Sequence, residues 1–442
     1  MNLLQLSWRN LTHRPLRALL SVLLFALSVG LITLLLSLRH QADRQFDANL
    51  AGIDLVVGAK GSPLELTLNS MYHVGYATGN IQLGQVRAFF NPKHPIVEAA
   101  VPLSVGDSYR GYRIVGTQPA LLDWYGAELA AGQMWQHDFE TVIGEEVARV
   151  NGLALGDTFR STHGIVDEGE DNIDHDDAFT VVGILAPSGT VMDQLVLTTN
   201  QTYWLSHDHA HDPAPAGGAD AGAGQSTEAG EAHDHAGDHT HHHVHEADHA
   251  PRPLTEEDPE REITSLLVRY RNPSSFQALS FPRNINENTE LLAANPAYEI
   301  NEVRRRFDSG QRILGLLVLI ITVISALSVF ISLFGALRER RYELALLRTM
   351  GAGRTKVFAL IILEGLTVAV LGYALGLVLA HGTLAVLAAG VQDDFRYTLS
   401  ATEFLPAEAY LLGVALFIAF VAAVIPAVQA ARTDIGATLT EG

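Results

Sequence analysis

The sequence has no cysteine among its 442 residues. A disulfide framework and a metal site built from thiolates are therefore excluded, although this absence does not assign the protein to a compartment. Basic residues are scarce in the middle of the chain, where residues 39–310 contain 17 Lys and Arg against 40 Asp and Glu. An acidic segment repels phosphate groups, so this composition argues against a nucleic-acid partner.

Sequence motifs for catalysis are also missing. A phosphate-binding loop needs the pattern Gly-x-x-x-x-Gly-Lys-Ser/Thr, in which backbone amides and a lysine surround the phosphates. The segments at 351–356 and 58–62 contain glycine and lysine but not in this order. No combination of nucleophile, base and acid is evident, and the many carboxylates suit a solvated surface. We therefore expect this chain not to be an enzyme, and any ATP to be bound by another subunit.

Four long apolar runs are the main feature that is present. Residues 18–38 and 313–337 carry no charge, and each is long enough to cross the hydrocarbon core of a bilayer as a helix. Two further spans are expected at 357–379, which contains Glu364, and at 409–431. The first run is too long for a secretory signal peptide and lacks a small-residue cleavage site, so we expect it to remain as a span.

A large hydrophilic domain, residues 39–310, separates the first two spans. Its apolar strand-like segments alternate with short helical ones, which indicates a mixed α/β fold. We expect strands at 53–57, 96–105, 112–116, 141–143, 180–185, 194–198 and 263–270, and helices at 121–126 and 145–151. The fold class is thus an α-helical four-span transmembrane bundle plus a large extracytoplasmic α/β domain.

Shorter segments complete the predicted topology. They are an amphipathic interfacial helix at 1–15, a charged loop at 338–356, a short exposed loop at 386–405 and a tail at 432–442. Near the ends of the spans, the side with both termini and the charged loop carries 10 Lys and Arg, and the opposite side carries seven. This modest bias favours cytoplasmic termini and an external location for the hydrophilic domain.

The charged loop has the composition of a basic helix at a membrane surface. Leu344 and Leu347 lie on one helical face, Leu346 and Met350 extend it, and Gly351 permits a left-handed helix end. Such a helix could follow the membrane or fit a groove in a partner. A plain loop that obeys the positive-inside rule is the alternative.

A longer motif covers the loop and the start of the third span. The stretch RERRYELALLRTMGAGRTKVFALIILEGL contains the pattern Arg-x-Glu-x-x-x-Leu-Arg-x-x-Gly-Ala, followed by Leu-Glu-Gly. It resembles the signature of MacB/FtsX-like ABC-transporter permeases, which include macrolide-exporting, lipoprotein-releasing and division-associated types. The resemblance implies that the loop is a coupling helix on an ATPase. The implied coupling residues are Arg341, Glu343, Leu347, Arg348, Met350, Gly351 and Ala352.

The hydrophilic domain resembles this family more loosely. The stretches GYRIVGTQPALLDWYGAELAAGQMW, VIGEEVARVNGLALGDTF and FTVVGILAPSGTVMDQLVLTT are similar to the periplasmic domain of MacB-type permeases. The resemblance implies a porter part interrupted by an inserted subdomain, which we place at about 118–203. It also implies a multi-pass protein of the bacterial inner membrane whose large domain lies in the periplasm.

The resemblance implies the function of a permease subunit. Such a subunit transmits ATP-driven motion from a separate ATPase, which holds ATP and Mg, to the periplasmic domain, and a substrate is moved or extracted on the outer side. The implied partners are that ATPase, a second permease copy in a homodimer, the bilayer, and a periplasmic adaptor or binding protein. An FtsX-like regulator that transports nothing and a metal-binding membrane sensor are the alternatives.

Polar and small residues in the third span suggest contacts with other helices. Glu364 is costly in lipid and should face protein or water, and its place in Leu-Glu-Gly favours helix packing. A position close enough to reach the headgroups is the alternative. Gly372 and Gly376 have the Gly-x-x-x-Gly spacing that permits close helix approach, and Gly365 adds another small residue. Packing within one subunit and packing between subunits both fit this pattern.

A histidine-rich segment interrupts the hydrophilic domain at 206–259. It nearly lacks large apolar side chains, so we expect a disordered loop. Imidazole at this density predicts weak, interchangeable binding of metals such as zinc, linked to zinc transport or sensing, and a solvated loop without metal is the alternative. The candidate ligands are His207, His209, His211, His233, His235, His239, His241, His242, His243, His245 and His249.

Overall fold

The computed structural model describes residues 15–163, 174–208, 254, 256–350, 352–394 and 399–432, with residues 5, 7, 9 and 12 near the N-terminus. The chain divides into two compact units, one made of Met1–Phe46 with Glu302–Gly442 and the other of Asp47–Asn301. The interfacial helix expected at 1–15 falls largely outside the described residues. The tail beyond Arg432 falls wholly outside them.

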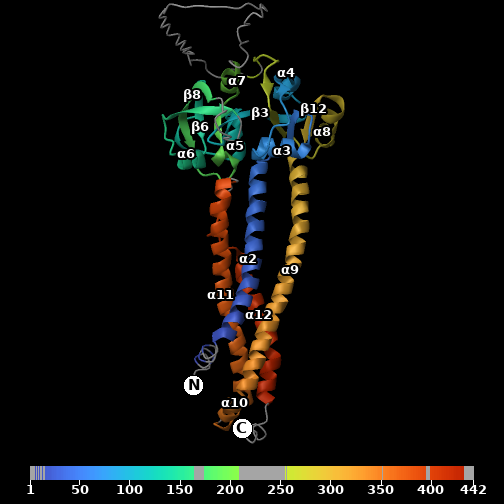
Figure 1. Ribbon diagram of the computed structural model, residues 1–442. Coiled ribbons are helices and arrows are strands. Elements are labelled where there is room, and N and C mark those ends of the chain that lie inside the picture. Colours follow the sequence, from blue (N-terminus) through green and yellow to red (C-terminus); the bar gives the residue numbers. More distant parts are fainter. Residues whose placement is uncertain are drawn as a thin grey trace, which may run out of the picture. The chain divides into compact units, whose positions relative to one another are not determined.

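Among the described residues, four helices are long and apolar enough to cross a membrane. They are α2 (Pro15–Leu50), α9 (Pro296–Glu339), α11 (Arg354–Asp394) and α12 (Pro406–Arg432), and Figure 1 draws them as long rods. The short helix α10 (Arg341–Thr349) stands between α9 and α11 in the chain. The four spans expected from the sequence are thereby confirmed.

Three of these helices extend by more than ten residues beyond the apolar runs that predicted them. Residues 39–50 and 296–310, which the sequence had assigned to the hydrophilic domain, belong to α2 and α9. The expected loop at 386–405 was wrong for its first residues, because α11 continues to Asp394. The polar residues 39–50 contain no Gly or Pro and continue a helix readily, so at α2 the hydropathy signal ends before the helix does. The 44 residues of α9 span about 66 Å, twice the thickness of the hydrocarbon core.

Small residues on α12 give α11 a close neighbour. Ala415, Ala419, Ala423 and Ala427 recur at four-residue intervals, and all four are at most 3% exposed. A Cβ atom placed on Gly365 of α11 would lie 3.0 Å from the Cβ of Ala423. Helices in a membrane associate through such close backbone packing, because lipid supplies no hydrophobic drive between them.

The other two packing glycines of α11 face α2. A Cβ on Gly376 would lie 2.8 Å from the carbonyl oxygen of Ala26 and 2.9 Å from the Cβ of Val29. A Cβ on Gly372 would lie 2.9 Å from the Cβ of Phe25. In this structure the Gly-x-x-x-Gly spacing therefore serves packing within one chain.

The second unit is built on a mixed sheet of 10 strands. The strand order is β12–β1–β11–β3–β4–β9–β6–β8–β5, and β7 pairs with β3 and β8. The pairs β4–β9 and β6–β8 are parallel, and the other pairs are antiparallel. The strands are β1 (Leu55–Ala59), β3 (Val97–Tyr109), β4 (Tyr112–Thr117), β5 (Leu129–Gly132), β6 (Glu140–Ile143), β7 (Thr158–His163), β8 (Asp174–Leu185), β9 (Val196–Thr199), β11 (Ser265–Tyr270) and β12 (Leu291–Ala294).

Helices connect these strands. They are α3 (Pro63–Tyr72), α4 (Leu83–Val86), α5 (Ala120–Tyr125), α6 (Glu145–Asn151), α7 (Asn200–Asp208) and α8 (Phe276–Asn288), and a second sheet pairs β2 (Ile81–Gln82) with β10 (Glu262–Ile263). The mixed α/β class is confirmed, and each expected strand and helix overlaps an observed one. The strands β5, β7 and β12 were missed because LAAG, TFRSTH and LLAA do not show the alternating pattern of a half-buried strand.

Two apolar cores lie along the sheet. One collects side chains of β1, β11 and β12, among them Leu55, Leu266 and Ala293. The other surrounds Ile143 and Phe179 on β6 and β8. Strand β3 pairs with β11 and with β4, so one continuous sheet joins the two cores. The inserted subdomain proposed at about 118–203 therefore shares its sheet with the rest of the domain.

The histidine-rich segment is shorter than the range expected from composition. Its first residues, including Ser206 and His207, belong to α7. At its other end Leu254 is 8% exposed and joins the first core, and the carbonyl of Pro259 accepts a hydrogen bond of 2.9 Å from the amide of Gly84. Expecting the whole of 206–259 to be disordered was therefore wrong at both ends, where a few side chains have partners in the folded domain.

We expect Gly376→Ala to destabilise the bundle, because the added methyl would meet the carbonyl of Ala26 and the Cβ of Val29. Overpacking of this kind costs about 1–3 kcal/mol. Gly382→Ala on the same helix is the matched control, since nothing lies within 4 Å of its added Cβ, and alanine favours a helix by up to about 1 kcal/mol. Thermal unfolding of the purified proteins should show a lower midpoint for the first variant alone. Equal midpoints would contradict this packing.

A buried histidine predicts acid sensitivity of the second unit. Burial, followed by repulsion from Arg113, lowers the pKa of His73 to about 3, so the ring stays neutral in the folded state. The unfolded chain binds the proton near pH 6.5, so stability falls by up to about 1.4 kcal/mol per pH unit as pH drops from 6.5 towards 3. His73→Asn retains a residue that tolerates the positive φ of 53°. Its unfolding midpoint should fall less steeply between pH 7 and pH 5 than that of the wild type, and parallel curves would rule out this contribution.

Candidate functional site

The short helix α10 and the residues after it carry the sequence motif. Arg340 separates α10 from α9, because its backbone leaves the helical conformation at φ −107° and ψ 15°. After α10, the exposed Gly353 precedes the start of α11 at Arg354. These interruptions make α10 a separate helix of 9 residues between two membrane spans.

One face of α10 is apolar and exposed. Tyr342, Leu346 and Met350 follow one another at four-residue intervals and so share a face. Their side chains are 54%, 48% and 79% exposed. Glu343 beside them and Arg354 at the start of α11 are also exposed. Apolar side chains that line up on an exposed helix face are typical of a surface that docks a partner.

The other motif residues are placed less completely. The side chains of Arg341 and Leu347, and the whole of Gly351, lie outside the described residues, while Arg348 and Ala352 are half-buried. The sequence had named Leu346 and Met350 as extensions of an apolar face but had missed Tyr342. Its four-residue spacing from Leu346 was the available signal.

A buried ion pair holds the start of α10 against α11. Glu364 Oε1 lies 3.8 Å from Arg340 Nη1, and the two side chains are only 5% and 14% exposed. The carboxylate of the third span therefore faces a cation of the protein instead of lipid headgroups. Because a lone charge in the membrane is costly, this pairing favours the observed position of Arg340 between α9 and α10.

A second buried pair lies about 25 Å further along α11. Nε2 of His381 is 3.3 Å from Oε2 of Glu408, and the side chains are 15% and 4% exposed. The hydroxyl of Tyr373 donates to the carbonyl of Glu408 over 2.9 Å. These contacts join α11 to the first turn of α12. The sequence missed them because the spacing of 27 residues between His381 and Glu408 carries no local pattern.

The connection between α11 and α12 is also tied to α2. Gln41 Nε2 donates to the carbonyl of Ser400 over 2.9 Å, and the amide of Ser400 donates to Gln41 Oε1 over 2.8 Å. Arg44 Nη1 lies 2.6 Å from Glu403 Oε1. The described end of this connection is therefore fastened to the extension of α2 that hydropathy did not predict.

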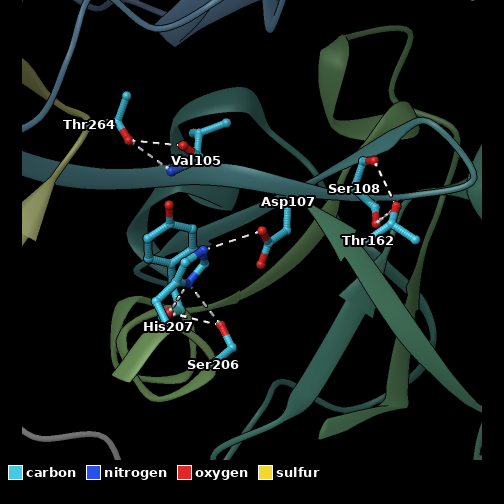
Figure 2. A network of polar contacts seen from close by, with 8 residues as sticks. Val105, Asp107, Ser108, Thr162, Ser206, His207 and Thr264 are labelled. Carbon is cyan, nitrogen blue, oxygen red and sulfur yellow. Dashed lines mark hydrogen bonds and ion pairs between the residues drawn. The ribbon is translucent and has the colours of Figure 1, made fainter. Parts of the chain in front are cut away.

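His207 is part of the folded domain rather than of a free loop. Its Nε2 lies 3.4 Å from Oδ1 of the buried Asp107, and its Nδ1 lies 2.8 Å from the carbonyl of Tyr203. Figure 2 shows His207 between Asp107 and Ser206. Burial, together with the charge of Asp107, raises the pKa of Tyr203.

The described residues offer no ligand set for zinc. Among them, no three His, Asp or Glu side chains lie close enough together to form a metal site. The ten other candidate histidines, from His209 to His249, lie outside them. Zinc binding by this segment stays a prediction.

Two family models match the chain. Residues 18–232 match the MacB-like periplasmic core domain, and residues 315–435 match the FtsX-like permease C-terminal region. The ABC transporter permease YtrF of Bacillus subtilis (strain 168) is 24% identical over 160 residues, which is 33% of this chain and 34% of that protein. The match thus spans about a third of the length of this relative. A crystal structure of a domain of a permease protein from Porphyromonas gingivalis covers 54% of this chain and 78% of its own, at 17% identity and a TM-score of 0.23.

The fold and these matches define a multi-pass membrane protein whose large periplasmic domain lies between the first and second spans. The FtsX-like match includes α10, most of the second span and the two later spans. The chain belongs to the MacB/FtsX family of permeases.

We expect Glu364→Gln to destabilise the bundle by about 2 kcal/mol, because Arg340 would lose the charge of its buried partner. The pair can be isolated by a double-mutant cycle with Arg340→Gln, measured as thermal unfolding of the purified protein. Glu339→Gln, one residue before Arg340 and exposed, is the control and should have little effect. A coupling energy near zero would mean that the two side chains do not interact.

Proposed function

We propose that this chain is the membrane subunit of an ABC transporter of the MacB or lipoprotein-releasing type. A separate ATPase drives it, and the periplasmic domain moves or extracts a substrate on the outer side of the membrane. The observation that carries this proposal is the exposed apolar face of α10, formed by Tyr342, Leu346 and Met350 on a short helix between two spans. A helix of this kind fits a groove in a partner protein.

The Arg340–Glu364 pair supports a role of α10 in transmission. A helix that receives a push must be connected to the spans, and this pair links the residue before α10 to a buried position on α11. The packing of Gly365, Gly372 and Gly376 then connects the middle of α11 to α12 and α2. A displacement of α10 is thereby passed to closely packed helices, which move as rigid elements.

The length of α2 and α9 supports movement of the outer domain. Both helices continue without interruption beyond their apolar runs, to Leu50 and from Pro296. A continuous helix resists sharp bending except at Pro, Gly or a bulge, and α2 contains no Pro or Gly between Leu31 and Leu50. Tilting of these spans in the membrane would therefore displace their outer ends, where Arg304 of α9 lies 3.8 Å from Asp43 of α2.

A second copy of the chain is the proposed partner within the membrane. A groove of about 730 Å³ lies between α2 and α9, lined by Leu20, Ser21, Ile324, Leu327, Ser328, Ile331, Ser332, Gly335, Arg338 and Glu339. Its serines and glycine are the residue types that membrane helices use to approach each other. Lipid tails gain nothing from such residues, so a helix of a second copy is the better occupant.

The coupling role predicts that Leu346→Asp inserts into the membrane normally but no longer associates with an ATPase. A charge at the centre of the exposed stripe must be desolvated in a protein groove, which costs several kcal/mol. Leu346→Met retains an apolar side chain and serves as the control. The two variants and the wild type would be purified from membranes of the source organism, and co-purifying ABC ATPase would be quantified by mass spectrometry. Equal recovery with the Asp variant would remove α10 from the coupling role.

A further inference from the structure

A cavity of about 310 Å³ lies in the second unit at the end of two parallel strands. Strands β4 and β9 run parallel, and each is followed directly by a helix, α5 after β4 and α7 after β9. The residues just after the strands, such as Gln118 and Asn200, line the cavity. Crevices at the carboxyl ends of parallel strands are where open α/β sheets bind ligands, because both chains turn away from the sheet there.

Aromatic side chains form the apolar part of this cavity. Trp135 and Trp204 both line the cavity. Most of each side chain is buried in the domain, and only 5% of Trp135 and 6% of Trp204 is exposed. The indole of Trp204 is held in place, because its Nε1 donates to the carbonyl of Glu262 over 2.7 Å and Arg261 lies 5.7 Å from its ring centre. Leu254, Pro119 and Ala120 complete the apolar lining. A pocket that combines aromatic and apolar walls with polar side chains is a common form of ligand site.

Two polar atoms in this lining lack hydrogen-bond partners within the part of the chain that the structure describes. They are Oγ1 of Thr117, a residue only 2% exposed, and Oε1 of Glu257. By contrast, the amide of Asn200 in the same lining donates to Ser104 Oγ and to the carbonyl of Gly116. A buried polar atom without a partner costs free energy, and both of these atoms belong to residues that line the cavity.

We propose that this cavity binds a small organic cation, a protonated amine with an apolar or aromatic body. The ionised carboxylate of Glu257 can only accept hydrogen bonds, so it calls for an N–H donor and favours one that carries positive charge. Indole rings attract cations, so Trp135 and Trp204 in the lining favour the same ligand and can cover its apolar body. The excess of Asp and Glu over Lys and Arg in residues 39–310 raises the local concentration of cations and repels anions.

This inference does not depend on the proposed coupling to an ATPase. It concerns residues of the second unit alone, and binding is measurable without ATP. It names a ligand class for a binding site and assigns no transported substrate.

The test uses three ligands that share one ring and differ in charge. Benzylammonium, benzyl alcohol and benzoate would be titrated into the full-length purified protein, and indole fluorescence would be followed, since two of the four tryptophans of the chain line the cavity. Benzylammonium should bind about tenfold more tightly than benzyl alcohol, as a charge-assisted hydrogen bond predicts, and benzoate should bind most weakly. Equal binding of the three ligands, or the absence of saturable binding by benzylammonium, would overturn the proposal.

Variants locate the binding within the cavity. Glu257→Gln keeps the size of the side chain but removes its charge, so the preference for benzylammonium over benzyl alcohol should fall at least threefold. Glu256→Gln, an exposed neighbour, should leave the preference unchanged. Thr117→Val removes the hydroxyl at nearly constant volume and should weaken benzylammonium binding while the protein keeps its unfolding midpoint. An unchanged preference in Glu257→Gln would show that the cation binds elsewhere and would refute this site.

Discussion

The structure of the membrane unit depends on the close approach of α11 to its two neighbours. Gly372 and Gly376 face α2, and one added carbon at either position would collide with backbone or Cβ atoms of that helix. Gly365 faces α12, where its neighbours belong to a row of buried alanines. In lipid, apolar side chains gain little by leaving the solvent, so helices associate through dense packing of small residues. This contact makes α11 the central element of the bundle, and the other features of the unit are arranged on it.

The buried ionisable side chains of α11 follow from this central position. Glu364 and His381 lie on the same helix about 25 Å apart, and each has a partner from another segment, Arg340 before α10 and Glu408 at the start of α12. An ionisable group in a membrane is tolerated when it is paired, so each pair favours one arrangement of the connected segments. The α10 side of the bundle is thereby linked to the side where α12 begins and where Gln41 of α2 bonds to Ser400.

In the second unit, the parallel strand pairs determine where the cavity forms. Most neighbours in the sheet are antiparallel, yet β4–β9 and β6–β8 are parallel. A parallel pair brings two chain reversals to the same edge, and at β4 and β9 these reversals enclose a cavity with Trp135 and Trp204 in its wall. Thr117 and Glu257 come from segments far apart in the chain, and only the tertiary fold brings them to one cavity.

Much of this protein was determined by local sequence. Apolar runs of more than 20 residues cross a membrane or are deeply buried, so hydropathy predicted the four spans. The motif at 341–365 indicated the family without any knowledge of tertiary contacts. The strands with strong apolar character, such as β3 and β11, were also predictable. Helix ends were not, because the polar residues of 39–50 have no hydropathy signal although they continue α2.

Only the tertiary structure decided which distant residues pair with each other. The partners Arg340 and Glu364, His381 and Glu408, and Asp107 and His207 lie 24, 27 and 100 positions apart, and no periodicity relates them. The glycine spacing of α11 showed that some helix would approach closely, but that this helix is α2 of the same chain depended on how the whole bundle packs. Composition likewise marked 206–259 as loop, whereas Leu254 and His207 have partners in the folded domain. Hydropathy and spacing act along the chain and can be read from it, while a charge or a cavity acquires its partner only when segments far apart in sequence are brought together.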